Sequence, residues 1–265
     1  MSGQQTYTLD NSIFTTELYL KILTFWFSTY PTPISASTEA DFKTWFGVGA
    51  SEEDKASFDQ KCIDLSSHAL KSLNPEHFIL PEFESFTEDK KHYPAIAAPF
   101  VEEFTRDRGD EIKNEDVALA LILLLDQMPR NAFRKEKSGI VYRHYDRIAR
   151  AVAYAIYEHG IDVCERFKGM ICWRFWFYLP LEHSEGLEEH EVLAAKNKDM
   201  LRTTSESGDA PAEMFLQKFT EAAEKHYGPL KRFGRYPWRN QWLGRQSTEE
   251  ERRYLDEGGD TFGTS

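Results

Sequence analysis

LALILLLDQMPRNAFR, residues 119–134, passes from an apolar run to a dense group of polar side chains. Proline lacks the backbone N–H that a helix interior needs, and it disfavours helical geometry in the residue before it. Pro129 therefore predicts that a buried helix ends near Gln127, and that a tight turn presents Arg130 and Asn131 before a second helix. The polar residues of the stretch are Asp126, Gln127, Arg130, Asn131 and Arg134.

The segments on either side of this stretch have the patterns of further helices. Residues 17–28 are apolar on nearly all sides, which predicts a well-buried helix. Thr38 and Ser51 each precede an aspartate three positions on, which predicts helix starts at both. The predicted helices span residues 17–28, 38–46, 51–70, 96–106, 115–127, 138–159, 184–200 and 211–227.

Local chemistry also predicts several helix boundaries. His183 or Ser184 is expected to cap the helix that runs to about residue 200. Asp209 begins the next helix, with a proline in its first turn, and the Gly-Pro pair at 228–229 is expected to end it. Ser247 with Glu250 has the spacing of a capping box for a short last helix.

The chain as a whole shows no convincing strand pattern and no hairpin-turn signal. We therefore predict one all-α domain over residues 1–265, built from stacked antiparallel helical hairpins. Net charge is −12, which argues against non-specific nucleic-acid binding by the whole protein. Basic residues nevertheless concentrate in residues 130–150 and 231–245, which is compatible with a local site for an anionic ligand.

The chain also carries signals of its environment. Its three cysteines have no metal-ligand spacing, and the odd number fits a reducing compartment. The polar start has no pattern of a secretory signal, and the longest apolar run is too short for a membrane span. We expect a cytoplasmic protein with no membrane partner, no metal site and no cofactor.

Three blocks carry a family likeness: LLLDQMPRNAFR (residues 123–134), FYLPLEHSEGLEEHE (177–191) and KRFGRYPWRNQWLGRQSTEEERRYL (231–255). They resemble the signature blocks of domain-of-unknown-function family 924, as do the early segments LTFWF and TWFGVGASEEDKASFDQ. The resemblance implies an all-helical, tetratricopeptide-like fold. Some fungal relatives look like arginine-containing cyclodipeptide synthases, which condense arginine from arginyl-tRNA with a second amino acid into a diketopiperazine. Those enzymes depend on an Asp-Asp-x-x-Glu motif, and this chain contains no Asp-Asp pair.

The first candidate site is the polar group of the central stretch. Arg130 and Arg134 could hold a phosphate or carboxylate by forked, charge-assisted hydrogen bonds, with Asp126 orienting one of them. Alternatively, an internal Asp–Arg pair pins the turn, and Asn131 bonds free backbone.

The second candidate site is the run Glu182, His183, Ser184 and Glu185. His183 could act as acid or base near neutral pH, Ser184 could accept an aminoacyl group, and the two glutamates could bind a guanidinium and move a proton. Alternatively, Ser184 is a helix cap and Glu185 a partner of the helix dipole.

The third candidate site is the C-terminal basic and aromatic block. Its proposed substrate-binding residues are Arg235, Trp238, Arg239 and Asn240. Such a pattern suits stacking on bases and contact with phosphates, or a packed loop whose arginines cover aromatic faces.

All three blocks follow predicted helix ends, so we expect Arg130, Glu182, His183, Glu185, Arg235 and Arg239 to meet in one cleft. Two functions stay open. One is an aminoacyl-tRNA-dependent cyclodipeptide synthase with arginyl-tRNA as its partner. The other is a non-catalytic helical scaffold that binds a peptide or protein partner, which rests on the fold alone.

Overall fold

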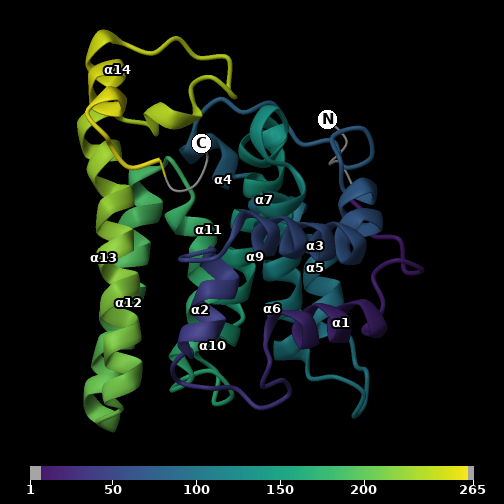
Figure 1. The fold of residues 1–265 in the computed structure, drawn as a ribbon. Coiled ribbons are helices and arrows are strands. Elements are labelled where there is room, and N and C mark those ends of the chain that lie inside the picture. Colours follow the sequence, from purple (N-terminus) through teal and green to yellow (C-terminus); the bar gives the residue numbers. More distant parts are fainter. Residues whose placement is uncertain (1–6, 262–265) are drawn as a thin grey trace.

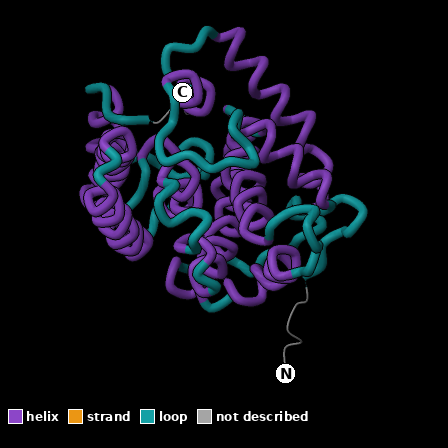
Figure 2. The backbone as a smooth tube through the Cα atoms, turned by 90° about the horizontal axis from the view of Figure 1, so that it is seen from below, coloured by secondary structure: helices purple, strands orange, loops and turns teal. Residues whose placement is uncertain are grey.

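The computed structural model describes residues 7–261, and within that range the chain forms helices and loops without a strand (Figure 1, Figure 2). The all-α prediction is confirmed. The α-helices are α1 (Thr16–Trp26), α2 (Glu39–Phe46), α3 (Glu52–Ser72), α4 (Phe86–Lys90), α5 (Tyr93–Thr105), α6 (Asn114–Ile122), α7 (Met128–Ala132), α8 (Ser138–Ile140), α9 (Asp146–Glu158), α10 (Ile171–Arg174), α11 (Leu179–Glu182), α12 (Leu187–Ser207), α13 (Ala210–Phe233) and α14 (Glu249–Asp256). Shorter π or 3₁₀ turns are η1 (Leu123–Gln127), η2 (Lys135–Lys137), η3 (Val141–Tyr145), η4 (Ile161–Val163), η5 (Phe175–Tyr178) and η6 (Pro237–Arg239).

The core lies around α6, whose residues are buried from Asp116 to Ile122. α1 and α5 pack against α6, and α9 packs against α5, so the apolar stretch at the centre of the sequence is enclosed by helices (Figure 1). Aromatic rings fill the adjoining space: Phe27 stacks on Trp173 at 4.2 Å, and Trp176 meets Trp26 and Trp45 edge-on. Removal of this apolar surface from water is the main stabilising contribution to the fold.

The predicted helix starts at Thr38 and Ser51 are confirmed. Each side chain accepts a hydrogen bond from the backbone N–H three residues on, and the aspartate there bonds back to the cap. Asp209 caps α13 in the predicted way. These predictions succeed because a cap depends on residues adjacent in sequence.

The predicted helix end at Gln127 is wrong. The chain continues through the π-helical turn η1, in which the N–H of Met128 bonds the carbonyl of Leu123, and then through α7. Pro129 lies in the first turn of α7, where no helical hydrogen bond requires the N–H that proline lacks. Arg130 and Asn131 therefore lie on a helix, and that helix ends at Ala132.

A second π-helical turn, η3, lies directly before α9. The N–H of Asp146 bonds the carbonyl of Val141, five residues back. A π-helical turn inserts one extra residue into a helix and is frequent at functional sites. The two turns bring Asp126 and Asp146 to the same nitrogen of one arginine, Nη2 of Arg130.

Helices α12 and α13 form a long hairpin joined by Gly208 and Asp209, and they lie side by side (Figure 1). Two boundaries differ from prediction here. α12 begins after Gly186 rather than at a side-chain cap, and α13 runs through Pro229 to Phe233 before Gly234 ends it with φ of 69°. A proline removes one hydrogen bond from a helix. In α13 the buried side chains of Leu216, Phe219 and Leu230 stabilise the helix on both sides of that position.

After α13 the chain forms what we call the C-terminal loop, residues 234–247. Tyr236 and Trp238 of this loop pack with Leu230 in a small apolar cluster of their own. The last helix is capped by Thr248 and Glu251, one position later than the predicted Ser247 and Glu250. Within residues 7–261, none of the helices is long and apolar enough to cross a membrane.

Candidate functional site

A group of buried polar side chains lies where η1, α7, α9, α11, α13 and the C-terminal loop meet. We call it the polar cluster, and its members are Asp126, Arg130, Asp146, Glu182, His183, His226 and Arg239. At its centre, Nη2 of Arg130 donates to Oδ1 of Asp126 at 3.2 Å and to Oδ1 of Asp146 at 2.6 Å. Each carboxylate thus has a positive partner, as buried charges require.

His183 lies against Asp126. Its Nδ1 is 2.9 Å from Oδ1 of Asp126, while the amide of Gln127 donates to Oδ2 at 2.6 Å. Burial alone would raise the pKa of the Asp126 carboxyl, but His183 and Arg130 hold that pKa well below its usual range. An ionised carboxylate can only accept, so the Nδ1 of His183 carries the proton.

The other ring nitrogen of His183 is therefore a base. Burial, assisted by the charge of Arg130, lowers the pKa of His183, so the imidazole is neutral at pH 7. No residue in the described range 7–261 hydrogen-bonds to its Nε2, and the side chain retains some exposure. This arrangement is the acid-oriented histidine that serves general-base catalysis in many enzymes.

Glu182 has the opposite character. Burial, with the nearby charge of Asp126, raises the pKa of the Glu182 carboxyl to about 8. Its Oε1 lies 3.1 Å from Nδ1 of His226, while its Oε2 hydrogen-bonds to no residue in the described part of the chain. Burial also lowers the pKa of His226 well below its usual value, so both partners are uncharged at neutral pH. Glu182 is consequently a proton donor.

Tyr236 of the C-terminal loop joins this region to α12. Its hydroxyl donates to the carbonyl of Glu182 at 2.9 Å and lies 3.0 Å from Nε2 of His190, which also contacts the carbonyl of Ser184. The Ser184 hydroxyl is fully buried and accepts from the N–H of Gly186, two residues on. Ser184 thus closes a local turn, and the structure does not bring its Oγ to His183.

Glu185 and Arg235 lie beside the polar cluster rather than in it. Both oxygens of Glu185 accept from Arg245, at 2.7 and 2.9 Å, and Oε1 also accepts the N–H of Tyr236. Arg235 makes a forked bond to Glu251 of α14, at 2.6 and 2.8 Å. These pairs fix the C-terminal loop to the turn between α11 and α12 and to α14.

The other predicted residues also have structural partners. Arg134 forks onto Asp59 of α3, and Asn131 bonds the carbonyl of Gln127 and accepts from Arg134. Trp238 stacks on Tyr236 at 4.4 Å. Asn240 donates to Ser247 and Glu251, within the C-terminal part of the chain.

Five of the predicted residues therefore converge: Asp126, Arg130, Glu182, His183 and Arg239. Sequence reasoning missed Asp146 and His226. Asp146 lies in a basic run, which is a weak signal for a buried partner of arginine. No local pattern distinguishes His226 within α13, because its role depends on contacts with residues far away in sequence.

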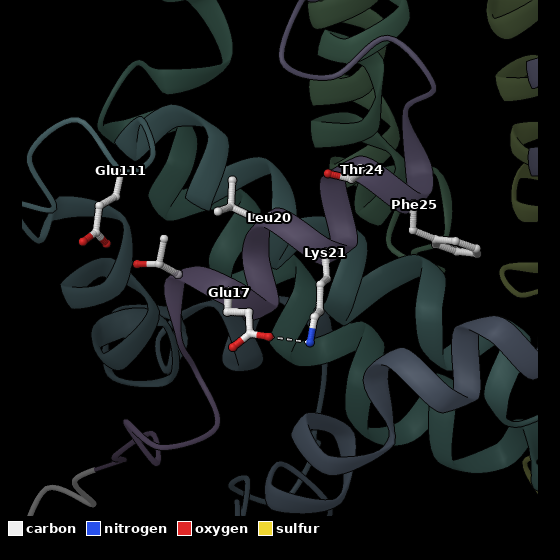
Figure 3. Close-up of a pocket in the computed structure, with 7 residues that line it drawn as sticks. Glu17, Leu20, Lys21, Thr24, Phe25 and Glu111 are labelled. Carbon is white, nitrogen blue, oxygen red and sulfur yellow. Dashed lines mark ion pairs between the residues drawn. The ribbon is translucent and has the colours of Figure 1, made fainter.

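A separate, open hollow lies on the outer face of α1 (Figure 3). It is lined by Thr16, Glu17, Leu20, Lys21, Thr24, Phe25 and Glu111. Its lysine is already paired with Glu17 at 2.6 Å, and the hollow shares no residue with the polar cluster. We therefore place the candidate site at the polar cluster. The described residues include no group of three or more metal-ligating side chains arranged to hold an ion.

The fold and the cluster define an all-α protein with an internal group of acidic and basic side chains between its central helices and its C-terminal loop. The chain belongs to the family described as "Bacterial protein of unknown function (DUF924)", whose sequence model matches residues 22–259.

Two further comparisons accompany this match. A solved structure of a protein of unknown function from Agrobacterium tumefaciens, ATU0120, is similar to the chain, with a TM-score of 0.56 and 27% identity. The alignment covers 92% of this chain and 99% of that one. A search among curated proteins finds no match.

Proposed function

We propose that the chain is an enzyme that forms amide bonds by general acid–base catalysis, with His183 as the base and Glu182 as the acid. One observation carries this proposal: neighbouring residues of one site have opposite proton assignments. His183 is a neutral imidazole held by ionised Asp126, and Glu182 is a carboxyl group that keeps its proton. Because their surroundings raise the pKa of Glu182 and lower that of His183, Glu182 is the candidate acid and His183 the candidate base.

The reaction that we propose is that of an arginine-containing cyclodipeptide synthase. The amino group of the second amino acid attacks the ester carbonyl of an arginyl-tRNA, a C–N bond forms, the ester C–O bond breaks and the tRNA leaves. Ring closure forms the second C–N bond when the arginine amino group attacks the carboxyl group of the second amino acid and water leaves. His183 Nε2 takes the proton from the attacking nitrogen, and Glu182 gives a proton to the leaving ribose oxygen. Support comes from the resemblance of the sequence blocks to the family, some fungal relatives of which look like such synthases. Because the Asp-Asp-x-x-Glu motif is absent, the acids in this proposal are Asp126 and Glu182.

The test is expression in a bacterial host with normal tRNA pools, followed by mass spectrometry of the medium for arginine diketopiperazines. Wild-type protein should yield product. His183→Asn and Glu182→Gln should each reduce it by about 10²-fold or more, the usual contribution of a general acid or base. Glu224→Gln, on the exposed face of α13, is the matched control and should leave the yield unchanged.

Soluble wild-type protein that yields no diketopiperazine would overturn the synthase proposal. Product at wild-type level from both variants would overturn the assignment of His183 and Glu182.

A further inference from the structure

Arg239 stands apart from the other arginines of the C-terminal loop. Arg235 and Arg245 each make a forked pair with a glutamate, with all four N–O distances between 2.6 and 2.9 Å. The guanidinium of Arg239 makes no hydrogen bond to any residue that the structure describes. Its nearest anion is Oδ2 of Asp146, at 3.7 Å from Nη1, and that oxygen accepts no hydrogen bond either.

Arg239 is nevertheless held firmly. The residue is only 6% exposed, and its guanidinium lies 4.3 Å from the ring of Tyr142 and 4.7 Å from that of Tyr236. Contact with two aromatic rings fixes the position of the charged group while leaving its N–H edge unused. A buried guanidinium without hydrogen-bond acceptors is unfavourable, so this side chain is prepared for a partner that the protein itself does not supply.

Arg130 presents a similar unused edge. It bonds Asp126 and Asp146 through Nη2 alone, and its Nε is buried without an acceptor. Arg130 and Arg239 approach Asp146 through different carboxylate oxygens, so the two guanidinium groups lie beside the same side chain. The side chain of Arg130 is 21% exposed and that of Arg239 is 7% exposed, so the pair lies at the edge of the polar cluster rather than sealed inside it.

We propose that Arg239 and Arg130 form an oxyanion subsite, which binds a phosphate or carboxylate group of the substrate beside His183. Arg130 uses one nitrogen for Asp126 and Asp146, and Arg239 makes no hydrogen bond, so the two guanidinium groups offer more donors than these aspartates take up. Planar forks match both kinds of oxyanion. The subsite deepens the proposed function, because a tRNA end carries phosphates and a free amino acid carries a carboxylate. Its test measures binding alone, so the subsite and the synthase activity can fail separately.

The test is calorimetric titration of the full chain with inorganic phosphate and, separately, with acetate, in Tris chloride at constant ionic strength and pH 7.5. We expect saturable binding of at least one of them at a single site. Tighter binding of phosphate would assign the subsite to a phosphate-bearing carrier, and tighter binding of acetate to an amino-acid carboxylate. Absence of saturable binding by both ions would overturn the proposal.

Two variants and a control locate the subsite. Arg239→Gln should weaken binding by about tenfold or more, as expected for the loss of a charged donor. Asp146→Asn keeps the side-chain shape but removes the competing negative charge, so binding should tighten severalfold. Arg232→Gln removes the same charge from an exposed pair with Glu250 and should leave the affinity unchanged.

Arg239→Gln is expected to weaken binding and Asp146→Asn to tighten it. The inference therefore stays testable if Arg239→Gln fails to fold, because general damage to the fold does not increase affinity. Equal affinities of wild type and the Asp146→Asn variant would overturn it.

Discussion

The backbone carbonyl oxygen of Trp242 lies 2.6 Å from the position that a Cβ atom on residue Gly139 would occupy. Real Cβ atoms essentially never approach an oxygen so closely, so only glycine allows the C-terminal loop to lie against α8. This contact, together with the Glu185–Arg245 pair, holds the loop against the helices that carry the polar cluster.

Gly139→Ala should therefore destabilise the protein by roughly 1–3 kcal/mol, the usual cost of forcing extra atoms into a packed interface. Chemical denaturation in urea measures the change. Gly169→Ala is the matched control: its φ is not in the positive range and no atom lies within 4 Å of a new Cβ, while alanine has less conformational freedom to lose on folding. That variant should be as stable as wild type or more so. Equal losses in both variants would contradict the account.

The proton on Glu182 makes a prediction about pH. The pKa of this carboxyl is about 8 in the folded protein, against an ordinary value of 4.5. Between these values the folded state holds a proton that the unfolded state has released, so the free energy of unfolding falls as pH rises through this window. Glu182→Gln cannot ionise, and its stability should exceed that of wild type increasingly above about pH 5, by an amount on the order of a few kcal/mol at pH 8.

Urea denaturation of wild type and variant from pH 4.5 to 8 measures this difference, since contributions from other residues are common to both proteins. Glu224→Gln should give a curve parallel to that of wild type. A parallel curve for Glu182→Gln as well would mean that the buried carboxyl ionises normally.

The Asp126–His183 contact makes a prediction about histidine titration. Burial and Arg130 lower the pKa of His183, and Asp126 opposes them. Removal of the negative charge in Asp126→Asn should lower the pKa of His183 further, because the main charge that opposes burial and Arg130 is then lost. NMR titration of the imidazole protons measures the shift, with the exposed Asp64→Asn as control. An unchanged or higher pKa in Asp126→Asn would show that this carboxylate does not orient the base.

The cap of the last helix makes a prediction about stability. Thr248 accepts from the N–H of Glu251, and Glu251 bonds back to Thr248 and also to Arg235. Thr248→Ala should cost about 1 kcal/mol, the typical value for loss of an N-cap. Thr44→Ala removes the same hydroxyl from the interior of α2, where alanine is preferred, and should be neutral or slightly stabilising. Equal effects of the two substitutions on unfolding would rule out a capping role.

The sequence predicts the local features of this fold well. The caps at Thr38, Ser51 and Asp209 are right because each depends on neighbours within four residues. The two prolines at 129 and 229 misled the prediction, since a proline ends a helix only when tertiary packing does not sustain it. Before position 129 the π-helical turn η1 lets the helix continue past the proline. The pattern of a single sequence does not reveal such turns.

The candidate site could also be predicted only in part, because only its local features can be read from the sequence. Charged residues beside a buried run, such as Asp126 and Arg130, are conspicuous in sequence. Which of them meet, and which find partners elsewhere, depends on contacts between distant segments: Glu185 is occupied by Arg245, sixty residues away, whereas Arg239 is left with unused donors. The proton states of Glu182 and His183 depend on burial, which becomes known only with the fold.

The π-helical turns η1 and η3 have a consequence for how this family tolerates insertions and deletions. Each turn carries one residue more than an α-helical turn would, and one residue corresponds to about 100° of rotation around a helix axis. Deletion of one residue from 123–125 would restore a regular helix and turn α7, with Arg130, relative to α6 and away from Asp146, although every residue of the cluster remained in the chain. Relatives that retain the same side chains but are one residue shorter in either turn should therefore keep the helical fold and lose the site. Alignment gaps at these two places are more informative about shared activity than overall identity.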